Sequence, residues 1–226
     1  MKKKTLTVAI ALVLVVALAV GATYAYLTAS SGPVKNTFVV GGAVADKDLK
    51  LFEHVASKNA DGSYTLDPAK ETDGNAYTVM PGVNLPKDPT VTVEKASGEY
   101  YLFVEVTKGS GFAPVTVGEK TGTPLSCNVD TAKWEKLSLT GEDANREVYV
   151  YCVTGASAIQ RAPVENVAVL KTIGDTQNTI TVNADNDIVA TLTSESASAL
   201  TFNAYACQAA GFADAAAAFT ACFGTK

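Results

Sequence analysis

Short runs of β-branched and aromatic residues recur along most of this chain, and turn residues separate them. Residues 90–94 (Thr-Val-Thr-Val-Glu) alternate between apolar and polar, while residues 100–106 (Tyr-Tyr-Leu-Phe-Val-Glu-Val) are apolar on both faces. We expect these two runs to form a hairpin in the core of a sheet. Further strands are predicted at residues 36–40, 147–153, 164–173, 178–182, 187–193 and 200–206. This spacing favours a mainly β fold, an antiparallel jelly-roll-like β-sandwich, over βαβ units.

The region before these runs is less regular. Residues 46–56 mix apolar and charged side chains, which fits a strand or one amphipathic turn of helix, and we favour the strand. The adjacent Asp61 and Gly62 predict a turn at residues 59–63. Residues 64–75 are polar, and we expect an exposed connection there.

The end of the chain differs in kind from the rest. Residues 211–224 are rich in alanine and place Phe212, Phe219 and Phe223 at spacings of seven and four, which is one stripe of a helix. Gly224 is a typical helix terminator. We expect a short C-terminal helix that packs its phenylalanines on the sandwich, with binding of a partner as the alternative role for the stripe.

The first residues have the three parts of a signal peptide. Lys2, Lys3 and Lys4 precede an apolar run at residues 6–20, and small residues follow. The alternative is an uncleaved membrane anchor, because the apolar run approaches the roughly 20 residues that span a bilayer. No basic cluster follows the run, and the next charge is Lys35, which favours cleavage. We therefore expect an exported protein, with several sites that satisfy a small-x-small cleavage rule, including those after Ala19, Ala22 and Ala25.

Charge gives a second constraint on function. The formal net charge is −5, and loss of the three N-terminal lysines would make it −8. An acidic surface argues against nucleic acid as a partner and is compatible with solubility outside a cell.

Four cysteines form an even set in a chain that we expect to meet an oxidising environment: Cys127, Cys152, Cys207 and Cys222. Two fall in neighbouring strand-like runs and two in the final strand and helix, which predicts the pairs Cys127–Cys152 and Cys207–Cys222. Closing the second loop would stabilise the fold by about 3 kcal/mol in the chain-entropy description. The alternative is a set of free, buried thiols.

Three segments together resemble one protein family. The first is Gly-Ala-Thr-Tyr-Ala-Tyr-Leu-Thr at 21–28 with Asn-Thr-Phe-Val-Val-Gly at 36–41. The second is Pro-Gly at 81–82, followed by Lys-Asp-Pro-Thr-Val-Thr-Val at 87–93 and Tyr-Leu-Phe-Val-Glu-Val at 101–106. The third is Leu-Thr-Phe-Asn-Ala-Tyr-Ala-Cys-Gln-Ala-Ala-Gly-Phe at 200–212. In order and spacing these segments resemble the TasA and camelysin group of secreted matrix fibre proteins, which are exported with a SipW-type signal peptidase.

The resemblance implies cleavage after Ala25, which would leave Tyr26 as the mature N-terminus. It also implies a jelly-roll domain that polymerises by donating its N-terminal segment to the next subunit. Residues 26–35 are small and polar, so we expect a mobile arm, and the short strand that follows is the candidate donor strand: Asn36, Thr37, Phe38, Val39 and Val40. Residues 26–41 would then form the intersubunit strand, and residues 42–226 a single β-sandwich domain.

Some camelysin relatives are described as metallopeptidases, so the resemblance also raises the expectation of a catalytic zinc site. Catalytic zinc normally takes three protein ligands, but the chain has one histidine, His54, and no His-Glu-x-x-His motif. We expect His54 to be a surface residue. Residues 183–187 offer alternating oxygen ligands without the glycine and distal glutamate of an EF-hand, which indicates a turn, with a calcium site as the alternative. The sequence predicts no catalytic residue, metal or cofactor.

Three functions follow from these observations. The favoured one is an exported structural protein that self-assembles into biofilm-matrix or cell-surface fibres, with copies of itself and other matrix proteins as partners. A monomeric cell-surface adhesion module would share the fold without the exchanged strand. A secreted metallopeptidase of the camelysin type is the third.

Overall fold

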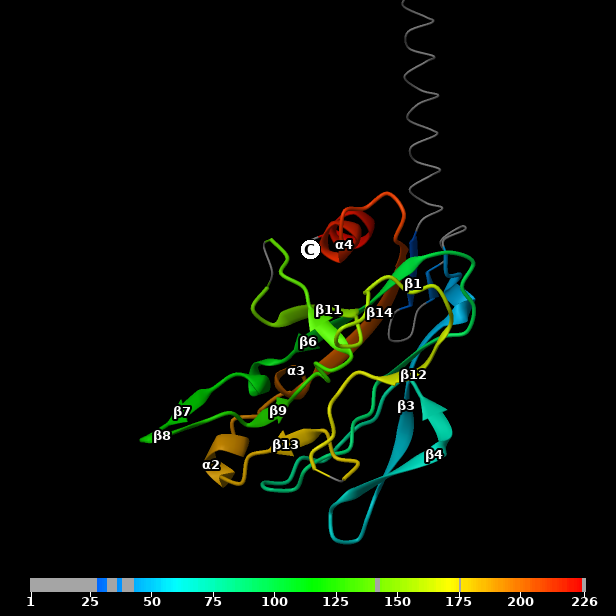
Figure 1. The fold of residues 1–226 in the computed structure, drawn as a ribbon. Coiled ribbons are helices and arrows are strands. Elements are labelled where there is room, and N and C mark those ends of the chain that lie inside the picture. The colour runs from blue at the N-terminus through cyan, green and yellow to red at the C-terminus, as the bar shows by residue number, and fades with distance from the viewer. Residues whose placement is uncertain (1–27, 32–35, 38–42, 141–142, 175, 225–226) are drawn as a thin grey trace, which may run out of the picture.

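The computed structural model describes residues 28–31, 36–37, 43–140, 143–174 and 176–224. It is mainly β, with antiparallel sheets and a short C-terminal helix, and this arrangement is consistent with the predicted β-sandwich (Figure 1). The six strands of the larger sheet are, in spatial order, β10 (Trp134–Lys136), β11 (Arg146–Tyr151), β6 (Tyr100–Lys108), β14 (Leu200–Gln208), β1 (Thr28–Ser31) and β2 (Asn36–Thr37).

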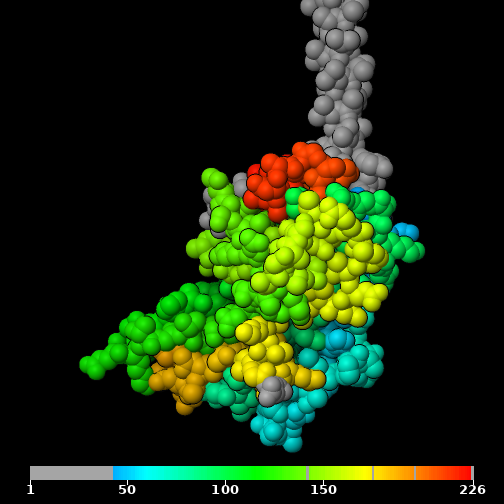
Figure 2. All heavy atoms as spheres, viewed as in Figure 1, coloured from blue at the N-terminus to red at the C-terminus, as the bar shows by residue number. Residues whose placement is uncertain are grey.

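A four-stranded sheet faces part of the larger one. Its strands are, in spatial order, β12 (Val164–Ala168), β5 (Thr90–Val93), β3 (Leu49–Lys58) and β4 (Tyr64–Thr72). Two small sheets pair β13 (Ile180–Val182) with β9 (Leu125–Cys127), and β7 (Val115–Val117) with β8 (Lys120–Gly122). The β7–β8 hairpin projects from the body beside a short helix, α2 (Asn186–Val189), as Figure 2 shows. The remaining short helices are η1 (Asp46–Asp48), η2 (Ser110–Phe112) and α3 (Glu195–Ser198).

The main core lies between the two larger sheets. Leu102 and Val104 of β6 and Phe202 of β14 share one buried cluster with Val91 and Val93 of β5. The indole nitrogen of the fully buried Trp134 donates to the carbonyl oxygen of Ala168 at 3.0 Å, which links β10 to the end of β12. Alternate residues of β6 face opposite sides, and both sides are covered, so this strand is the apolar central strand that the sequence predicts.

The C-terminal helix α4 (Ala215–Phe223) covers the other face of β6 and β14. The carboxylate of Asp214 accepts a hydrogen bond from the backbone N–H of Ala217 at 2.8 Å and caps the helix. Gly224 ends it with a φ of 76°, a conformation that favours glycine. Phe219 is fully buried, with its ring centroid 5.2 Å from that of Phe103. The predicted end of the helix at Gly224 and its docking through phenylalanine are confirmed, but the helix begins at Ala215, so Phe212 precedes it and only Phe219 and Phe223 of the predicted stripe lie on it.

The predicted hairpin of residues 90–94 and 100–106 is wrong. β5 belongs to the four-stranded sheet and β6 to the six-stranded sheet, so the chain crosses between sheets at residues 94–99. Both segments are strands, but their apolar side chains meet face to face across the core instead of side by side along one ladder.

Two other expectations are also wrong. Residues 64–72 form β4, which pairs with β3 around the turn predicted at residues 59–63, where Gly62 has a φ of 86°. This strand is polar because it lies at the edge of its sheet. The strand expected at residues 187–193 is replaced by α2, which the side chain of Asp185 caps through the backbone N–H groups of Asp187 and Ile188.

Candidate functional site

The N-terminal segment forms the last two strands of the six-stranded sheet. β1 pairs antiparallel with the C-terminal half of β14, from Thr28 opposite Cys207 to Ser31 opposite Ala204. The chain then turns back, and β2 pairs with β1, with Asn36 opposite Ser31. Residues 28–31, which we expected in a mobile arm, are therefore a strand.

The candidate donor strand is only partly covered by the structure. Asn36 and Thr37 form β2. Phe38, Val39 and Val40 lie outside the described residues, as does the expected cleavage position between Ala25 and Tyr26.

The N-terminal half of β14 has a partner on one side only among the described residues. β6 pairs with β14 along its whole length, from Lys108 opposite Leu200 to Tyr100 opposite Gln208. No described strand pairs with residues 200–203 on the side that β1 occupies further along. On this side of residues 200–203, the backbone N–H and C=O groups that point outward therefore have no strand partner in the described part of the chain.

A groove lies beside this open stretch. A cavity of about 230 Å³ separates β14, at Leu200 and Phe202, from β3, at Leu51 and Glu53. A second cavity of about 400 Å³ shares Leu200 and is lined mainly by apolar side chains, among them Tyr77, Val79, Leu85, Phe112, Leu125 and Ile180. The open backbone edge thus runs along a hollow with an apolar lining.

Three other edge strands of the two larger sheets carry features that hinder strand addition. The pairing of β4 with β3 shifts register between His54 and Val55 of β3, and β4 contains Pro68, which has no N–H to donate. β12 carries a register shift between Val164 and Val167, with Asn166 at a φ of 49°. β10 has only three residues. By contrast, in the described part of the molecule, residues 200–203 of β14 form an edge without such protection.

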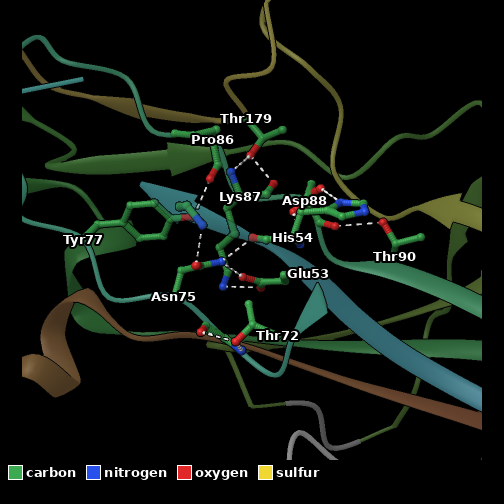
Figure 3. A network of polar contacts seen from close by, with 12 residues as sticks. Glu53, His54, Thr72, Asn75, Tyr77, Pro86, Lys87, Asp88, Thr90 and Thr179 are labelled. Carbon is green, nitrogen blue, oxygen red and sulfur yellow. Dashed lines mark hydrogen bonds and ion pairs between the residues drawn. The ribbon is translucent and has the colours of Figure 1, made fainter. Parts of the chain in front are cut away.

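A polar network lies at the wall shared by the two cavities (Figure 3). The ammonium nitrogen of Lys87 lies 2.5 Å from Oε1 of Glu53, and the side-chain amide nitrogen of Asn75 donates to Oε2 at 3.2 Å. Glu53 is 5% exposed, so this carboxylate is buried, whereas its two partners are half-buried. A buried charge is tolerated only when it is paired and hydrogen-bonded, as it is here.

His54 extends the network to the next segment. Its Nδ1 lies 2.6 Å from Oδ2 of Asp88, and its backbone N–H donates to Oδ1 of the same carboxylate at 3.0 Å. The expected surface histidine is therefore half-buried and bound to a carboxylate. Asp88 follows Lys87 directly, so its contact with His54 anchors the same stretch of chain to β3.

Residues 183–187 form a turn that leads into α2. Asp185 caps the helix, and Lys120 of β8 lies 2.9 Å from Asp185 and 2.8 Å from Asp187. Within the described residues, no group of three or more His, Cys, Asp or Glu side chains could hold a metal ion.

The cysteine prediction is half correct. Cys207 of β14 and Cys222 of α4 form a disulfide. Cys127 and Cys152 are free, so the pair Cys127–Cys152 is wrong. Cys127 lies on β9, which pairs with β13, whereas Cys152 follows β11 in the six-stranded sheet, so the two strand-like runs belong to different sheets and do not pair. Burial raises the pKa of the Cys127 thiol to about 11.

Sequence reasoning missed the Glu53, Asn75 and Lys87 group. Asn75 and Lys87 are 22 and 34 positions from Glu53, and no local motif joins them. The available signal was a single glutamate within the apolar stretch Leu-Phe-Glu-His-Val, because a charge in such a run needs a partner when the strand is buried.

Comparisons with protein-family models, with curated proteins and with solved structures gave no match to this chain. No helix in the described part of the chain is long and apolar enough to cross a bilayer.

Proposed function

We propose that this protein is an exported structural subunit that assembles into extracellular fibres by passing residues 26–41 to β14 of the next copy. The observation that carries the proposal is the placement of β1. This strand near the N-terminus pairs with residues 204–207 of β14, and the edge of β14 continues beyond β1 at residues 200–203. The same edge of β14 can accept residues 26–41 of another copy.

Physical chemistry gives a reason for the exchange. In the closed chain the polypeptide turns back after Ser31, so residues 200–203 gain no partner from β1 or β2. A segment from a neighbouring copy can continue along β14 in place of the turn. Four further residues of antiparallel pairing add about four hydrogen bonds, worth about 2–6 kcal/mol before the cost of ordering the segment. Pro33 fits there only where its nitrogen faces away from β14.

The geometry of such a contact favours growth. The donated segment and the accepting edge are different surfaces, so the contact is heterologous and can repeat from copy to copy as an open filament. The bulges and Pro68 at the other edges discourage side-to-side pairing. Addition would therefore be directed to one edge.

A second function is favoured by the same hairpin. Because β1 and β2 pair within one chain, a closed monomer has its arm in place, as expected for a monomeric surface-binding module. Assembly then depends on whether the arm exchanges.

The test compares the chain that begins at Tyr26 with a variant that lacks residues 26–41. Negative-stain microscopy and light scattering over a range of concentrations should show filaments of the first and folded monomers of the second, with circular dichroism as the folding control. A free peptide of residues 26–41 should stop growth by occupying the acceptor edge, and a scrambled peptide should not. Undiminished fibre growth by the deletion variant would refute strand donation, and a chain that stays monomeric at every concentration would favour the binding module.

A further inference from the structure

The network beside the groove places an amine and a carboxamide on the two oxygens of one buried carboxylate. Lys87 and Asn75 bind the two different oxygens of the Glu53 carboxylate, at 2.5 Å and 3.2 Å (Figure 3). We propose that Lys87 and Asn75 become joined by an intramolecular amide bond, with Glu53 as the group that transfers protons. This modification is independent of the proposed assembly.

The orientation of the Asn75 carboxamide is fixed by backbone groups of opposite kind. Its oxygen accepts from the N–H of Ala56 at 2.8 Å, and its nitrogen donates to the carbonyl of His54 at 2.9 Å. An exchange of oxygen and nitrogen would lose both bonds, so the side-chain nitrogen is the atom beside Glu53.

The short contact between the pair is a path for proton transfer. Glu53 is 5% exposed and the Lys87 side chain 12%, and the Phe202 ring centroid lies 5.6 Å from the Lys87 nitrogen, so bulk water has little access to the two groups. Transfer of one proton from the ammonium to the carboxylate across this contact gives a neutral amine. The neutral amine is the nucleophile that amide formation requires.

The reacting groups are held on a clamped segment. The backbone N–H of Lys87 donates to the hydroxyl of Thr179 at 3.0 Å, and that hydroxyl donates to the Lys87 carbonyl. The Tyr77 hydroxyl donates to the carbonyl of Pro86, and Asp88 is bound by His54. Contacts on three successive residues limit the motion of the lysine backbone, which supplies the fixed orientation that an intramolecular reaction needs.

The bond changes balance without an added reagent. Glu53 takes a proton from the Lys87 nitrogen through Oε1, and the nitrogen attacks Cγ of Asn75. The N–H of Ala56 stabilises the negative charge that develops on the Asn75 oxygen. Glu53 then gives this proton to the Asn75 nitrogen beside Oε2, the bond from Cγ to that nitrogen breaks, and the carboxylate takes a second proton from the attacking nitrogen. One amide replaces another, and ammonia leaves with the second proton as ammonium, so the carboxylate is restored.

The molecule contains a matched group that should not react. Asn203 donates to Oε1 of Glu105 at 3.0 Å, and Arg146 donates to Oε2 at 2.7 Å. The arrangement repeats that of Asn75, Glu53 and Lys87, with arginine in the place of lysine. A guanidinium does not lose its proton in proteins and is therefore no nucleophile.

Mass spectrometry of the purified, reduced and alkylated chain tests the proposal. With the N-terminus assigned by peptide mapping, the intact mass should be about 17 Da below that of the sequence, the loss of one ammonia. Digestion should give one branched peptide that joins Lys87 to Asn75. Glu53→Gln should restore the full mass, and the matched control Glu105→Gln should keep the loss.

A folded wild-type chain of full mass, with unmodified Lys87 and Asn75 in its peptides, would overturn the proposal without reference to any variant. Conversion of Asn75 to aspartate alone would overturn it too, because water would then have attacked in place of the amine. Retention of the cross-link in Glu53→Gln would refute the assigned role of the carboxylate.

Discussion

Phe219 is the side chain through which α4 is fixed to the six-stranded sheet, and its truncation is the sharpest test of the fold. The ring is fully buried, with its centroid 5.2 Å from that of Phe103 and 5.8 Å from that of Tyr205. Burial of about 150 Å² or more of aromatic surface at about 25 cal/mol per Å² corresponds to about 4 kcal/mol. Phe219→Ala should therefore lower the free energy of unfolding by about 3–5 kcal/mol, the range observed for buried phenylalanine.

Thermal unfolding followed by circular dichroism measures this loss. In a chain of this length each kcal/mol lowers the Tm by about 2–4 °C, so the expected shift is about 6–20 °C. Phe223→Ala is the matched control, because Phe223 lies on the same helix but is only half-buried, and it should shift the Tm by much less. Equal shifts in the two variants, or no shift in Phe219→Ala, would show that α4 is not docked through Phe219.

Three further predictions concern the cysteines and one half-buried carboxylate. Cys222→Ser removes the disulfide to Cys207, which spans a sequence separation of 15, and should lower the free energy of unfolding by about 3 kcal/mol in denaturant titrations. Without reductant, iodoacetamide should label only Cys127 and Cys152, with Cys152 first, because burial raises the pKa of the Cys127 thiol to about 11 and a thiolate is the reactive form. Desolvation acts to raise the pKa of Glu147, but hydrogen bonds from Lys108 and Lys136 outweigh it and lower the pKa to about 2. Because the folded value lies below the ordinary one, Glu147 stabilises the fold above about pH 5 and loses this effect as the pH falls toward 2, so Glu147→Gln should be less stable than wild type at pH 7 and equal to it near pH 2.

The features that sequence predicted well are those with a local cause. The apolar run at residues 100–106 predicts a strand buried on both faces because it is short, apolar at alternate and intervening positions, and rich in aromatic and β-branched residues. Phe219, Phe223 and Gly224 likewise predict α4 from spacing and a terminator alone, although Phe212, the first residue of the predicted stripe, precedes the helix. The Cys207–Cys222 pair follows because a short loop joins the final strand to the helix that covers it.

The errors have non-local causes. Alternation in residues 90–94 shows that one face is buried, but it does not show which sheet the strand joins, and β5 and β6 lie in different sheets. The Cys127–Cys152 pair failed for the same reason, since neighbours in sequence were taken as neighbours in space. The group of Glu53, Asn75 and Lys87 comes together only when the segment after β4 folds back over β3. Long-range placement of this kind leaves no periodic signal in one sequence.

A cross-strand disulfide can distinguish a closed arm from an exchanged one. Ala29 lies opposite Ala206 in the β1–β14 register. Opposed residues in antiparallel strands have Cα atoms about 4.5–5.5 Å apart, which is within the range that a disulfide spans. A variant with both Ala29→Cys and Ala206→Cys should therefore join the arm to whichever copy of β14 holds it.

The order of oxidation and assembly decides the product of this variant. Oxidation of monomers should close each chain on itself, so that they no longer form filaments, whereas oxidation of preformed filaments should give a ladder of covalent oligomers on non-reducing gels. The single variant Ala29→Cys controls for links to Cys127 and Cys152, which are free in the native chain. Filaments that yield only covalently closed monomers would mean that every arm stays on its own β14. Strand exchange would then not be the mode of assembly, because the part of β14 that its own β1 covers has no room for a neighbour's β1.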